Sequence, residues 1–150
     1  MGFHIINADL LESNADAILH QVNCKGIMGS GLAKQIRNKY PTVYDEYVSL
    51  CKQHKDDTKS LLGFIQGVHI NEKQDIVNLF AQDGYGKDKQ YTDYNALRKC
   101  LKLVNSYYKG KVIGLPYKMG CGLGGGRWID VASIIVEELT QCEVFIYRLL

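Results

Sequence analysis

The segment GCGLGGG, residues 120–126, holds five glycines in seven positions and directly precedes the apolar pattern of an expected helix. Glycine lets the backbone come close to a ligand, but each glycine also raises the entropic cost of ordering a loop. Free backbone N–H groups at the start of a helix form a favourable site for an anion. The segment therefore predicts a loop that binds phosphate through its amides.

A second segment, NCKGIMGSGLA at 23–33, also leads from an apolar stretch through glycines into an expected helix. It offers the same free N–H donors and the same positive helix end. Two such segments in one small domain fit a diphosphate. Tight turns with no ligand are the alternative that the local pattern leaves open.

Two familiar nucleotide motifs do not fit these segments. Gly120, Gly122 and Gly125 match G-x-G-x-x-G, but only one helix and one strand remain before the chain ends, too little for a dinucleotide-binding half. Gly26 and Gly31 have the spacing of a P-loop, but Leu32 stands where that motif requires lysine.

Composition indicates a single globular domain over residues 1–150. Hydrophobic residues make up 46% and charged residues 23%, and the formal net charge is only +2. Basic and acidic residues are interspersed, with no basic stripe for a phosphate backbone. Nucleic acid is therefore not expected as the principal partner.

Cysteine usage and the chain start indicate a reducing compartment. The five cysteines are scattered with no C-x-x-C pair, which argues against a disulfide framework or a zinc site. No secretory signal and no apolar run of membrane-spanning length is present. We expect a cytoplasmic protein without membrane contact, metal or cofactor.

The hydrophobic pattern alternates between strands and helices. Strands are expected over 3–9, 17–23, 63–70, 75–80, 111–116 and 143–150, and helices over 30–40, 43–54, 94–110 and 128–139. This order predicts an α/β fold, a three-layer α/β/α domain with a mixed, largely parallel central sheet. Ligands of such sheets bind beyond the carboxyl ends of the strands, where Asp9, Asn23 and the loops 81–92 and 116–126 follow.

Taken in order, three stretches resemble the macrodomain, the ADP-ribose-binding module. They are NADLLESNADAILHQVNCKGIMGSGLAKQI, NLFAQDGYGKDKQYTDYNALRKCL and IGLPYKMGCGLGGGRW, and the similarity spans nearly the whole chain. The branch that the chain resembles contains the fungal ADP-ribose-1″-phosphate phosphatase, the terminal ADP-ribose glycohydrolase and the DNA-ADP-ribosyl hydrolase antitoxins.

The resemblance implies a set of ligand contacts. Asp9 would accept a hydrogen bond from the adenine amino group, and Asn23 would bind hydroxyls of the distal ribose with its donor and acceptor together. Tyr147 would lie beside adenine, or else be an ordinary core or surface tyrosine. The implied ligand-binding residues are Asp9, Leu10, Asn23, Gly29, Ser30, Gly31, Gln82, Met119, Gly120, Cys121, Gly122, Leu123, Gly124 and Tyr147.

The resemblance leaves catalysis open. Gln82 stands where the glycohydrolase branch has a lysine, and glutamine forms no covalent adduct of that kind. Gly124 stands where the glycohydrolase has an aspartate, although the antitoxins have glycine there. His20 matches a histidine of the phosphatase and is the candidate catalytic residue, since an imidazole titrates near neutral pH. A hydrogen-bonded core histidine is the alternative.

Two functions are consistent with these residues. The first is a hydrolase that removes phosphate from ADP-ribose 1″-phosphate, or ADP-ribose from a modified macromolecule. The second is a non-catalytic ADP-ribose-binding module. The expected partners are ADP-ribose or ADP-ribose 1″-phosphate, together with ADP-ribosylated macromolecules under the hydrolase hypothesis.

Overall fold

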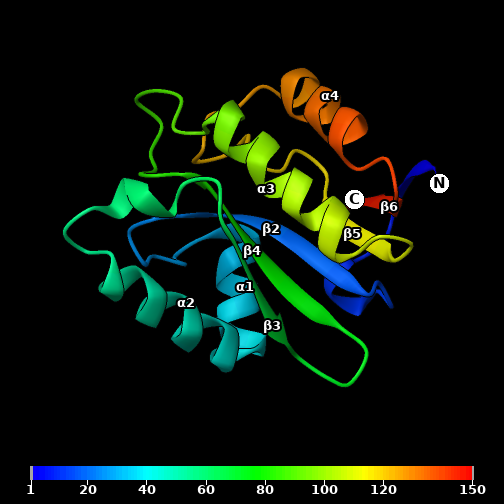
Figure 1. Ribbon diagram of the computed structural model, residues 1–150, viewed down its shortest axis with the longest axis horizontal. Helices are drawn as coiled ribbons and strands as arrows, with labels where there is room; N and C mark the ends of the chain where they lie inside the picture. The colour runs from blue at the N-terminus through cyan, green and yellow to red at the C-terminus, as the bar shows by residue number, and fades with distance from the viewer. Residues whose placement is uncertain (1, 150) are drawn as a thin grey trace.

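One six-stranded sheet organises the computed structural model, which describes residues 2–149 (Figure 1). The strand order is β1-β6-β5-β2-β4-β3, and every pairing is parallel except that of β3 with β4. The predicted mixed, largely parallel sheet is thus confirmed. The strands are β1 (Phe3–Ile6), β2 (Ala17–Asn23), β3 (Ile65–His69), β4 (Asp75–Gln82), β5 (Val112–Pro116) and β6 (Glu143–Tyr147).

Helices cover both faces of the sheet and complete the three layers. In Figure 1, α1 (Gly31–Lys39) and α2 (Pro41–Gln53) lie on one face, and α3 (Tyr94–Tyr107) and α4 (Trp128–Glu138) lie on the other. The second helix begins at Pro41 rather than at the expected Val43. Proline suits the first turn of a helix, because its φ is already helical and it needs no N–H partner there.

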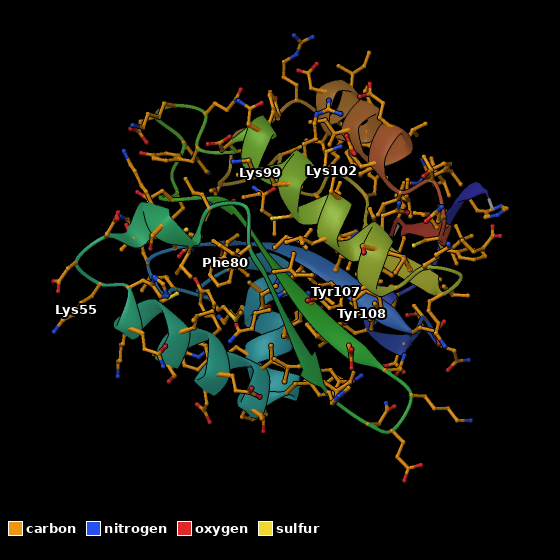
Figure 2. All side chains as sticks on the ribbon, viewed as in Figure 1. Lys55, Phe80, Lys99, Lys102, Tyr107 and Tyr108 are labelled. Atoms are coloured by element: carbon orange, nitrogen blue, oxygen red, sulfur yellow. The ribbon has the colours of Figure 1, made fainter. Side chains whose placement is uncertain are left out.

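Strands β2 and β4 are buried on both faces and form the centre of the hydrophobic core. Leu19 and Leu79 pack towards α3 and α4, whereas Ile18 and Phe80 pack towards α1 and α2. Figure 2 shows Phe80 in the interior beside α2. Near-continuous apolar runs of this kind are typical of parallel strands that are covered on both sides.

The parallel strands end at one edge of the sheet, and the loops that follow them gather there. The residue after β1, the glycine segment after β2, the loop after β4 and the glycine segment after β5 all start from this edge. A register shift between Val22 and Asn23 displaces the end of β2 relative to β4. The expected final strand ends at Tyr147, and its last expected residue, number 150, lies outside the described residues.

Candidate functional site

A cleft of about 840 Å³ opens at the carboxyl edge of the sheet. Its walls come from the end of β2, the first glycine segment with the start of α1, the loop after β4, and the second glycine segment. Both segments that the sequence marks as phosphate loops therefore border one space, as parallel strand ends require.

The cleft carries no negative side chain among the residues that the structure describes. Its charged side chains are Lys87 and Lys118, and His20 is its only histidine within the described chain. Gly31, Leu32 and Ala33 line it with the first turn of α1, whose N-cap residue Ser30 makes no side-chain capping bond. The first amides of a helix have no partner within the helix, so this end of the cleft attracts anions.

Asn23 fastens the first glycine segment with its own side chain. Its Nδ2 donates to the Ile27 carbonyl at 2.8 Å, and its Oδ1 accepts from the Lys25 amide at 3.0 Å and from the Tyr47 hydroxyl at 2.8 Å. Asn23 lies at the cleft as expected. Its carbonyl oxygen, however, is occupied by protein donors, so the expected use of donor and acceptor together on a ribose does not fit this arrangement.

A glutamine pair and a threonine fasten the second glycine segment. Thr92 Oγ1 donates to the Gly120 carbonyl at 2.7 Å, and Gln21 Nε2 donates to both Thr92 Oγ1 and Gln82 Oε1 at 2.8 Å. Gln82 Nε2 donates in turn to the Gly84 carbonyl at 2.8 Å. Gln82 lines the cleft, but both ends of its amide hold loops in place. The sequence reasoning missed Gln21, whose only local signal is its position beside His20 on β2.

The glycines of the second segment differ in what surrounds them. A Cβ on Gly124 would lie 2.5 Å from Thr92 Oγ1, and a Cβ on Gly120 would lie 2.7 Å from Gln21 Oε1. Around Gly122, by contrast, no atom lies within 4 Å of such a Cβ. Gly120 and Gly124 are thus needed for packing, whereas Gly122 faces open space in the cleft.

His20 is buried at the cleft floor and bound to Asn78. Only 2% of its surface is exposed, and its Nε2 lies 2.5 Å from Asn78 Oδ1. Asn78 Nδ2 donates to Gln66 at 3.0 Å, so Oδ1 is the acceptor and Nε2 of His20 carries the proton. Burial lowers the pKa of His20 to about 4. The expected titration near neutral pH is therefore wrong, because the buried ring stays neutral there.

Four of the expected ligand-binding residues lie outside the cleft lining: Asp9, Leu10, Cys121 and Tyr147. The Tyr147 ring and the Leu10 side chain pack over Gly114, and Cys121 Sγ contacts the Met119 carbonyl at 3.5 Å. The other expected residues, His20, Asn23, Gly29, Ser30, Gly31, Gln82, Met119, Gly120, Gly122, Leu123 and Gly124, all line the cleft.

Asp9 borders a smaller hollow of about 400 Å³ together with Gln35, Asn38 and Lys39 of α1. One Asp9 oxygen accepts from the Leu11 amide at 3.0 Å and starts a short 3-10 turn. Residues spaced by three and four positions share one side of a helix, so this hollow and the main cleft follow the same side of α1.

Comparison with known proteins identifies the family. The family model described as Macro domain matches residues 19–135. The chain belongs to the macro domain family. The matched range contains both glycine segments and every residue that lines the cleft.

Relatives of this macro domain include proteins named as enzymes that act on ADP-ribose derivatives. An ADP-ribose 1″-phosphate phosphatase of Meyerozyma guilliermondii is 31% identical over 94% of this chain and 96% of the relative. A DNA ADP-ribosyl glycohydrolase of Mycobacterium tuberculosis is 25% identical over 90% of this chain, which spans only 38% of that relative. The structure of Thermosipho africanus DarTG in complex with ADP-ribose is 22% identical, with a TM-score of 0.79 over 97% of this chain and 41% of the other.

Among residues 2–149, no group of three or more His, Cys, Asp or Glu side chains could hold a metal ion. No helix in the described part of the macro domain is long and apolar enough to cross a membrane.

Gly124→Ala should destabilise this macro domain, because the added methyl would meet Thr92 and the Gly120 carbonyl. We expect the free energy of unfolding to fall by about 1–3 kcal/mol, as is typical of overpacking. Gly122→Ala is the matched control and should leave stability nearly unchanged. Urea denaturation measures both, and equal stability of the two variants would contradict the assignment.

The free energy of unfolding should fall at acidic pH because of His20. Its folded-state pKa of about 4 lies below the ordinary 6.5, so the unfolded chain takes up a proton first as pH falls. The stability due to neutral His20 is thus full above pH 6.5 and is lost progressively between pH 6.5 and 4. We expect a loss of about 2 kcal/mol from pH 7 to pH 5.

His20→Gln keeps a donor for Asn78 but does not titrate. Urea denaturation of wild type and variant at both pH values isolates the contribution of His20, because the other histidines are common to both chains. If the two chains lose equal stability between pH 7 and pH 5, His20 does not have the lowered pKa.

Proposed function

We propose that this macro domain binds ADP-ribose, with the diphosphate between the start of α1 and the second glycine segment. The observation that carries the proposal is a cleft lined by the first turn of a helix, glycine backbone and two lysines and, among the described residues, by no carboxylate. A diphosphate needs such donors and positive charge, and side chains would block the close approach of the backbone.

The two hollows along α1 support an extended nucleotide. We assign the adenine to the smaller hollow, which Asp9 borders. One carboxylate oxygen of Asp9 accepts from the Leu11 amide, and the other would accept from the adenine amino group. Each helical residue adds about 1.5 Å, so Gln35 lies about 6 Å along the axis from Gly31. This distance suits a nucleotide whose adenosine lies beside Gln35 and whose phosphates lie beside Gly31. The distal ribose then lies near Asn23 and His20 in the main cleft.

We further propose that the bound compound is ADP-ribose 1″-phosphate and that the domain hydrolyses its terminal phosphate ester. The named activity of the fungal relative, which aligns over nearly the full length of both chains, supports this choice. His20 would orient the attacking water through Nδ1, the ring nitrogen that faces away from Asn78. Because its pKa is about 4, His20 accepts a hydrogen bond at neutral pH but has no proton to donate from Nδ1.

A binding module without catalysis is the second candidate. It is favoured by the engagement of Gln82 at both ends of its amide, which leaves no nucleophile or proton donor at that position. Incubation of the purified domain with ADP-ribose 1″-phosphate decides between the two. Phosphate release that is lost in His20→Gln supports the phosphatase, and tight binding without release supports the module.

Gly122→Val should abolish ADP-ribose binding without unfolding the protein. The side chain enters open space in the cleft, where it would take the place proposed for a phosphate. Isothermal titration calorimetry should show at least about a hundredfold weaker binding, and the unfolding midpoint should hardly change.

Ser106→Val is the control for this variant, because Ser106 is exposed on α3 and the change adds the same side chain away from the cleft. It should bind like wild type. Unchanged affinity of Gly122→Val would overturn the placement of the diphosphate.

A further inference from the structure

The hydroxyl of Tyr47 lies beneath the first glycine segment. Tyr47 comes from α2 and has no exposed surface. Its Oη lies 2.7 Å from the Asn23 carbonyl and 2.8 Å from Asn23 Oδ1, so its single proton is shared between two acceptors of one residue. One buried hydroxyl thus holds both the backbone and the side chain of Asn23.

The other end of the same turn also faces this hydroxyl. Burial raises the pKa of Tyr47 strongly, and the backbone amides of Gly26 and Ile27 oppose that rise, as amides directed at the oxygen do. The hydroxyl therefore donates to the residue that opens the turn 23–27 and lies near the amides that close it. Within the same turn, the Asn23 side chain bonds to the Lys25 amide and to the amide and carbonyl of Ile27.

This turn determines where the exposed part of the glycine segment lies. Met28 is buried directly after it, and Gly29, Ser30 and Gly31 then lead into α1 along the cleft. Glycines have no side chains with which to anchor themselves, so their position depends on the residues before and after them. A hydroxyl that holds the turn therefore acts on the cleft from outside it.

The ring of Tyr47 is held independently of its hydroxyl. It stacks on Phe80 with ring centroids 5.9 Å apart, within the core between the sheet and α2 (Figure 2 labels Phe80). Loss of the hydroxyl therefore leaves the ring in place. The two Asn23 oxygens then lose the Tyr47 donor, while Oδ1 keeps the Lys25 amide, and the loss of a buried hydrogen bond costs stability.

We propose that Tyr47 is a positioning residue, which holds the first glycine segment in its ligand-binding conformation through Asn23 and does not touch the ligand. The inference rests on the proposed function only for the identity of the ligand. The preorganised loop itself is a property of the free protein.

Tyr47→Phe tests the inference in the presence of ligand. We expect the Kd for ADP-ribose to rise about tenfold, as for loss of one buried hydrogen bond that orders a site. The Kd for adenosine, which lacks the phosphates and the distal ribose, should stay unchanged in an NMR titration. A general loss of stability would weaken both ligands equally, so a parallel loss would overturn the positioning role.

Tyr44→Phe is the matched control. Tyr44 lies on the same helix with its ring beneath Arg37, and its hydroxyl has no hydrogen-bond partner in the described chain. This variant should bind ADP-ribose and adenosine like wild type. If Tyr47→Phe also binds ADP-ribose like wild type, the inference fails although the proposed function stands.

Amide hydrogen exchange of the free protein tests the inference without any ligand. Tyr47→Phe should speed exchange at residues 25–31 and leave β2 and β4 protected, whereas Tyr44→Phe should change neither. If wild type does not bind ADP-ribose, only the proposed function is rejected. The exchange experiment needs no ligand and still decides the role of Tyr47. Unchanged exchange at 25–31 would overturn that role.

Discussion

Side-chain hydrogen bonds to glycine-rich backbone are the interactions on which the site depends. The two segments that border the cleft have few side chains of their own, so each is held by residues from elsewhere. Asn23 and Tyr47 hold the first, and Thr92, with Gln21 behind it, holds the second. This arrangement leaves backbone amides free towards the cleft while the loops behind them are ordered. The glycine segments are thus ordered in the free protein, so ligand binding does not have to supply the entropic cost of ordering them.

The sheet explains why the hydrogen bonds that hold the two glycine segments occur side by side. Strands β2 and β4 are buried on both faces, and their pairing places the ends of both at one edge. The side chains that hold the loops come from the last residues of these strands, from α2 and, for Thr92, from the loop just before α3. Tyr47 and Thr92 act on the cleft without lining it, whereas Gln21, Asn23 and Gln82 hold the loops and also line the cleft. The open space around Gly122 makes it an informative site for substitution, whereas the close contacts around Gly124 make it a poor one.

Charge and protonation limit the chemistry available in the cleft. Its lining combines two lysines with helix amides and, among the described residues, lacks carboxylates, which suits an anionic ligand. The one buried histidine there stays neutral at physiological pH because burial outweighs its bond to Asn78. Gln82 is engaged on both sides. The proposed diphosphate site thus has many contributors, whereas the proposed bond cleavage would depend on His20 and a water that it orients.

The sequence by itself determined the order of strands and helices, the sheet class, the family and the two glycine segments beside the site. The family follows from the resemblance of three stretches, and the rest follows from periodicity and residue spacing, which are local properties of the chain. Only the tertiary structure decided that His20 is neutral, that Asn23 and Gln82 hold loops, and that Tyr47 reaches a turn 24 residues earlier in the chain. The physical reason is that burial, hydrogen-bond partners and free space are set by atoms from distant segments, which no local pattern specifies.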